Sequence, residues 1–168
     1  MLNHSSTAAI LLRPLPLAAL VLLAFNDHVL KGSGHLPGAI TGKLSDLAGL
    51  AYFPLVLFVC LRSSERFLRR VFGLAAHREG SDRRLLDWAC ALTAAVFSAS
   101  KLSPAAADLV VAAADLLLPG PDRARVVTDP TDLATVPAVL LARQHARRVL
   151  DDSAAYGTHP ADQGQLPI

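Results

Sequence analysis

Charged residues are scarce in this 168-residue chain, which argues against an ordinary water-soluble domain. Asp, Glu, Lys and Arg make up 18% of the sequence, whereas soluble domains are about a quarter charged. The only two cysteines, Cys60 and Cys90, fall inside apolar runs, which excludes a disulfide framework. Aromatic residues make up only 5%, too few for a complete belt at two membrane surfaces. The remaining composition, 52% hydrophobic with a mean hydropathy of +0.40, indicates a membrane protein.

Four apolar stretches are candidate membrane spans, because about 20 apolar residues are needed to cross ~30 Å of hydrocarbon. We expect a separate short helix at 104–118, since Ser103 and Pro104 have the pattern of an N-cap followed by proline at the first helical position. The sequence does not decide whether this helix is transmembrane or interfacial. The predicted fold is an all-α integral membrane four-helix bundle in one domain, residues 1–150, followed by a disordered polar tail, 151–168. The four predicted spans are residues 8–28, 44–62, 85–102 and 131–149.

The distribution of arginine along the chain predicts how the four spans are oriented in the membrane. Residues 62–84 contain seven arginines between two apolar runs, and the positive-inside rule places such a loop in the cytoplasm. Four spans then put both termini on the cytoplasmic side of the cell inner membrane. A nucleic-acid partner is not expected, since the same run is explained as a cytoplasmic loop. The first run is interpreted as an uncleaved span, because "NDHVLK" follows it where a small-residue cleavage site should be.

Two short stretches, "KLSDLA" at 43–48 and "DPTDLA" at 129–134, repeat one pattern. In both, a hydroxyl residue precedes an aspartate, and Leu-Ala opens an apolar run. We interpret them as two helix N-termini with Asp46 and Asp132 in first turns, where a carboxylate complements exposed N–H groups. Asp129 followed by Pro130 has the pattern of an N-cap with proline at the first helical position. A second interpretation is a two-fold repeat of helix pairs. In that repeat Lys43 and Asp129 are equivalent, and we hypothesise that they pair.

The signatures N-D-x-x-L-K and T-G-K-L-S-D-x-A-G-L, followed later by D-P-T-D-L, resemble those of small bacterial integral-membrane proteins, a resemblance that implies no activity. It covers residues 26–54 and 129–134. The layout is also remotely similar to the VanZ-like family of four-span proteins, whose polar motifs open the second and fourth spans. Asp46 stands where that family has a histidine, and Val136 where it has an asparagine.

Polar residues expected at the outer membrane face form the candidate binding site, because ionisable groups at membrane depth are costly and are functional candidates by default. Neither a cofactor nor a metal is expected, since His28 and His35 do not have the spacing of a metal-binding motif. The candidate substrate-binding residues are Asn26, Asp27, His28, Lys31, Lys43, Asp46, Lys101, Asp129 and Asp132.

Two classes of function fit this sequence. The first is a structural or accessory membrane protein, a homo-oligomer or part of a larger membrane complex. The second is a binding protein, transporter or intramembrane enzyme for a small polar or lipid-headgroup substrate at the outer cluster. Whether the chain is an enzyme stays open. Convergence of Lys43, Asp46, Asp129 and Asp132 around a pocket would favour the second class.

Overall fold

The computed structural model describes residues 7–34, 36–73, 81–117 and 126–157, and no β-strand occurs among them. The all-α prediction is confirmed for this part of the chain. The elements in chain order are η1 (Ala9–Leu12), α2 (Pro14–Phe25), η2 (Asn26–Leu30), α3 (Lys31–Ser33), α4 (Gly38–Phe72), α5 (Ser81–Leu102), α6 (Pro104–Leu117), η3 (Pro130–Thr135) and α7 (Ala138–Gly157).

The N-terminal segment is interrupted rather than forming one helix over 8–28. Arg13 is extended, with ψ 159°, because the ring of Pro14 disfavours the helical conformation at the residue before it. This break separates the 3-10 helix η1 from α2. Beyond α2 the chain continues through the π-helical turn η2 into α3. Gly34, with φ +68°, then ends α3 in the left-handed region that favours glycine.

Helix α4 is the central element and packs against α2, α5 and α7. Its 35 residues extend beyond the predicted 44–62 at both ends and, at 1.5 Å per residue, give it a length of about 52 Å. The helix begins at Gly38, directly after Pro37, and Asp46 therefore lies in its third turn. The prediction that Asp46 occupies a first turn is therefore wrong.

The third and fourth predicted spans differ in regularity. Helix α5 covers the predicted span 85–102 and begins four residues before it. Helix α6 confirms the short helix predicted after Ser103, and the Ser103 Oγ accepts a hydrogen bond from the Ala106 amide. The continuous helix predicted at 131–149 is wrong, because 3-10 helix η3 ends before Pro137 and α7 starts after it. Proline lacks the N–H that an uninterrupted helix needs there. Helix α7 continues to Gly157, so the first part of the predicted disordered tail is helical. Residues 158–168 lie outside the described residues.

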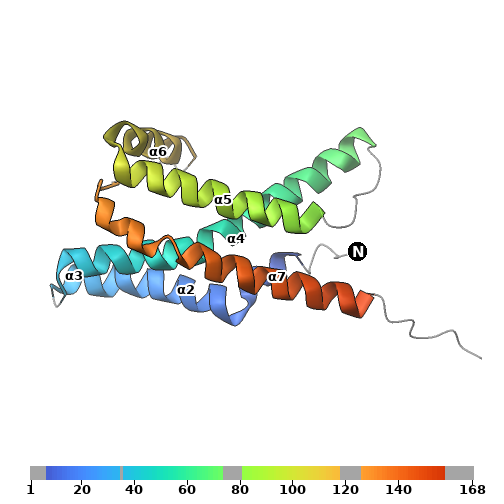
Figure 1. Cartoon of the computed structure of the whole chain (residues 1–168), viewed down its shortest axis with the longest axis horizontal. Helices are drawn as coiled ribbons and strands as arrows, with labels where there is room; N and C mark the ends of the chain where they lie inside the picture. The colour runs from blue at the N-terminus through green and yellow to red at the C-terminus, as the bar shows by residue number, and fades with distance from the viewer. Residues whose placement is uncertain (1–6, 35, 74–80, 118–125, 158–168) are drawn as a thin grey trace, which may run out of the picture.

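The long helices run side by side in alternating directions, as Figure 1 shows. One end of the molecule gathers α3, the start of α4, the end of α5, α6 and η3; the opposite end gathers the end of α4, the start of α5 and the end of α7. We name the second of these the arginine end, because Arg62 and Arg83 lie there.

The core lies where α4, α5 and α7 meet. Leu55, Phe58 and Leu86 are fully buried in it. On α7 the buried residues Ala138, Ala142 and Ala146 recur every four positions and therefore share one helix face, which packs against this core. Such small side chains permit close approach of neighbouring helices.

Two of the described helices, α4 and α5, are long and apolar enough to cross a bilayer by length and composition. The stretch Pro14–Leu30 is apolar but shorter. Many large apolar side chains in these helices are exposed, including Phe53 at 57%, Trp88 at 73% and Leu92 at 52%.

Candidate functional site

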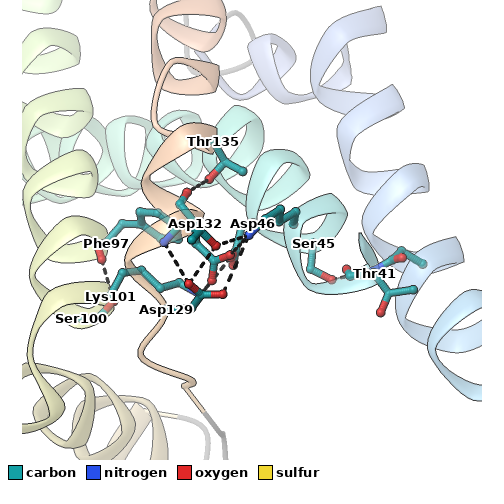
Figure 2. A network of polar contacts seen from close by, with 12 residues as sticks. Thr41, Ser45, Asp46, Phe97, Ser100, Lys101, Asp129, Asp132 and Thr135 are labelled. Carbon is teal, nitrogen blue, oxygen red and sulfur yellow. Dashed lines mark hydrogen bonds and ion pairs between the residues drawn. The ribbon is translucent and has the colours of Figure 1, made fainter. Parts of the chain in front are cut away.

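A cluster of five charged side chains lies at the end of the molecule opposite the arginine end. Lys43 and Asp46 come from α4, Lys101 from the last turn of α5, and Asp129 and Asp132 from the cap and first turn of η3. We call these five residues the charged cluster; Figure 2 labels four of them, Asp46, Lys101, Asp129 and Asp132. Three sequence segments that are far apart in the chain therefore supply one site.

Lys101 and Asp132 are the two buried ion-pairing groups of the cluster. The Lys101 ammonium lies 2.9 Å from an Asp46 carboxylate oxygen and 2.7 Å from Oδ2 of Asp132, and the lysine side chain is only 9% exposed. The same ammonium stands 5.3 Å from the centre of the Phe97 ring, within cation–π range. One cation thus links α4, α5 and η3.

Lys43 adds a second cation on the more exposed side of the cluster. It donates to Oδ1 of Asp132 at 2.7 Å and to the Thr131 hydroxyl at 2.7 Å. The hypothesised partner, Asp129, is 3.9 Å away, so the pair exists but Asp132 is the closer ligand. Asp132 consequently binds one lysine with each oxygen.

The two similar stretches, 43–48 and 129–134, have only part of the geometry that a structural repeat would give them. Asp132 lies in the first turn of η3 and Asp129 is its N-cap, as predicted. Residues 43–48, however, are α-helical within α4, whereas residues 130–134 belong to the 3-10 helix η3. The two stretches are in contact but have different backbone structures.

Asp129 is the N-cap of η3, and Thr131 fixes its carboxylate by hydrogen bonds. Its Oδ1 accepts hydrogen bonds from the Thr131 hydroxyl at 2.8 Å and the Thr131 amide at 2.9 Å. These two bonds hold the pKa of Asp129 below its ordinary value of 3.8. The carboxylate form is therefore the form that the folded chain stabilises.

Acidification is expected to release this cap only below pH 3.8. Because the folded-state pKa is lowered, Asp129 contributes stability that is complete above the unfolded pKa and is lost as pH falls through the folded pKa. In an NMR titration the Thr131 amide shift should have its midpoint below 3.8, and Asp129→Asn, which cannot titrate, should remove it. A midpoint at or above that value would contradict the cap geometry.

A second polar network adjoins the charged cluster through Ser45, the neighbour of Asp46. Asn26 is fully buried and donates to the Thr41 carbonyl and the Ser45 hydroxyl, each at 2.7 Å. Ser45 donates to Asp27 at 2.7 Å, and Asp27 pairs with Lys31 at 2.6 Å. The π-helical turn η2 places these groups towards α4, and π-helical turns are frequent at functional sites.

The structure thus assembles eight of the nine candidate residues in two adjoining networks. The exception is His28, which is exposed and takes part in none of the contacts that the structure describes for them. His35 lies outside the described residues. In the part of the chain that the structure describes, no group of three His, Cys, Asp or Glu side chains is arranged to hold a metal ion.

A groove of about 890 Å³ opens beside both networks. Its wall along α4 and α5 is mostly apolar and includes Leu50, Phe53, Leu92 and Val96, with the single hydroxyl of Thr93 among them. Its polar part consists of side chains from the two networks and their neighbours, chiefly Lys31, Ser45, Asp46, Lys101, Asp129 and Asp132. The site therefore combines an apolar slot with a charged rim.

Two glycines of α4 leave room for this groove. Gly42 and Gly49 are seven residues apart, so they lie on the same helix face, and both line the groove. A Cβ placed at either position would meet no atom within 4 Å. The space is consequently open rather than a site of close helix packing.

Sequence reasoning did not identify the hydroxyl and aromatic partners of the candidate site. Thr131, Ser45 and Phe97 contact the candidate residues directly. Ser45 and Thr131 stand next to Asp46 and Asp132 within the two similar stretches, and that adjacency was the available signal. Phe97 lies one helical turn before Lys101, a spacing that places both on one face.

The arginine end carries its own ion pairs, which were also not predicted. Arg62, with a side chain only 8% exposed, lies 2.9 Å from Glu65 and 2.7 Å from Asp82. One to two turns into α5, Asp87 binds Arg143 at 2.8 Å and Arg147 at 2.5 Å. Asp87 was visible as a lone charge at the start of an apolar run, but its partners on α7 were not.

Comparison with models of known protein families, with curated protein sequences and with solved structures finds no match to this chain. The groove and the two polar ends are therefore the features of the molecule from which a function can be inferred.

Proposed function

We propose that the chain is a multi-pass protein of the cell inner membrane that binds a membrane lipid in the groove, with the lipid headgroup at the charged cluster. The observation that carries this proposal is the two-part lining of the groove. Its wall is mostly apolar over the stretch of α4 and α5 that would face acyl chains, and its charged groups are confined to one end. An amphiphile has the same division.

The spacing of the charged ends supports the membrane placement. On α4, Lys43 and Arg62 are 19 residues apart, and on α5 the same interval separates Asp82 from Lys101. At 1.5 Å per residue this is about 28 Å, close to the ~30 Å thickness of bilayer hydrocarbon. Exposed apolar side chains such as Phe53 occupy the interval, where contact with lipid would remove the cost of their exposure.

The proposed topology has four passes, with the interrupted α2 segment and the η3–α7 segment accompanying α4 and α5. Both ends of the described chain lie near the arginine end: Arg66 donates to the Thr7 hydroxyl at 2.7 Å, and Arg83 pairs with Asp151 at 2.6 Å. With that end in the cytoplasm by the positive-inside rule, both termini are cytoplasmic and the charged cluster faces outward.

The experiment that tests this function is a measurement of bound lipid. Protein purified from native membranes in a mild detergent and washed extensively should retain about one lipid per chain, detected by native mass spectrometry and identified after extraction. Protein that remains folded and monodisperse but carries no lipid would contradict the proposal.

A second candidate is the structural or accessory role. It is favoured by the observation that Lys101 joins α4, α5 and η3 in one ion-pair network, as a structural link would. This role requires no ligand in the groove. The lipid measurement therefore separates the two functions.

A further inference from the structure

The charge balance of the two polar networks leaves one negative charge in excess. Four carboxylates, those of Asp27, Asp46, Asp129 and Asp132, face three ammonium groups, those of Lys31, Lys43 and Lys101. A bound group that carries a positive charge would neutralise the site. A purely anionic headgroup would increase the imbalance.

Two of the three lysines, Lys43 and Lys101, are already engaged inside the charged cluster. Lys101 is enclosed by two carboxylates and the Phe97 ring, and Lys43 is bound by Asp132 and Thr131. An anionic ligand would have to displace these short contacts to reach either ammonium group. Such displacement is costly because the carboxylates would be left with fewer partners.

Asp129 offers acceptor capacity. Its Oδ1 is occupied by Thr131, but its Oδ2 is 3.9 Å from Lys43, which is longer than a hydrogen bond, and its side chain is 41% exposed. Asp46 also lines the groove, with its side chain 19% exposed. A donor at the rim can therefore reach carboxylate oxygens without breaking the network.

From these observations we propose that the groove selects lipids whose headgroup carries an ammonium group, with Asp129 and Asp46 as its acceptors and the acyl chain along the apolar wall. This proposal rests on the proposed function, since it requires a lipid in the groove. Lys31, which lines the groove and is 43% exposed, is placed to accompany the phosphate of a zwitterionic headgroup.

The test is a titration of delipidated full-length protein in detergent with phosphatidylethanolamine and phosphatidylglycerol of identical acyl chains, read by native mass spectrometry. We expect at least a tenfold preference for the ethanolamine lipid. Asp129→Asn, an exposed substitution that keeps the size of the side chain, should reduce the preference to about threefold or less. Asp46→Asn should reduce it in the same direction.

Asp108→Asn is the matched control, because Asp108 is an exposed carboxylate on α6 that does not line the groove, and it should leave the preference unchanged. Free phosphoethanolamine at millimolar concentration should not displace the lipid; displacement would overturn the assignment to a lipid. Equal binding of the two lipids, or a preference for phosphatidylglycerol, would overturn the ammonium proposal while leaving lipid binding intact. Absence of any lipid binding would overturn both proposals.

Discussion

Lys101→Met is expected to destabilise the folded chain by about 3–5 kcal/mol, the usual cost of removing one partner from a buried ion pair. The substitution keeps an unbranched side chain of similar length but removes the cation between Asp46 and Asp132, which are 2.9 and 2.7 Å from it. Two carboxylates would remain side by side without their shared partner. Reversible unfolding in mixed detergent micelles measures the loss.

Lys31→Met is the matched control for this prediction. Lys31 also pairs with an aspartate, at 2.6 Å, but its side chain is 43% exposed. Exposed ion pairs are worth about 0–1 kcal/mol, so the control should lose little. If both variants lost the same small amount, Lys101 would not be the structural centre of the charged cluster.

Gly49→Leu is expected to abolish copurification of the lipid while preserving the fold. Gly49 lines the groove, where a Cβ meets no atom within 4 Å and about 890 Å³ of open space lies beyond it, so the leucine side chain would project into the space proposed for the ligand. Replacing glycine within a helix also removes a conformational cost of up to about 1 kcal/mol. The lipid-to-protein ratio should fall at least tenfold, and thermal stability should be unchanged or higher.

Ala95→Leu provides the comparison, because Ala95 is exposed on α5 and does not line the groove. Its lipid content should equal that of the unmodified chain. Full lipid retention in Gly49→Leu would show that the ligand lies elsewhere on the protein.

Local patterns in the sequence predicted the helical class and some boundaries, because these depend on neighbouring residues. Ser103 and Pro104 predicted the start of α6, and Asp129 with Pro130 predicted the cap of η3. The helix breaks at Arg13 and Pro137 were not predicted, because the spans were chosen by the length of apolar runs. That criterion takes no account of the way proline changes the backbone beside it.

The site was predictable as a set of residues but not as a set of contacts. The sequence assigned Asp46, Lys101 and Asp132 to one face of the membrane. Their pairing depends on how α4, α5 and η3 pack, and no local pattern contains that information. The incorrect assignment of Asp46 to a first turn has a different origin. The residues "GAITG", at 38–42, form about the first one and a half turns of α4, although two glycines in five residues are unfavourable in a helix.

The central claim is that α4 crosses the membrane between the charged cluster and the arginine end, and cysteine accessibility tests it most directly. Leu36→Cys and Phe72→Cys, each in a background with Cys60→Ala and Cys90→Ala, place one thiol at an exposed position beyond either end of the apolar stretch. In spheroplasts a membrane-impermeant maleimide should label the Leu36→Cys variant at once and the Phe72→Cys variant only after lysis. Equal labelling of both variants before lysis, or recovery of the protein in the soluble fraction, would contradict the account.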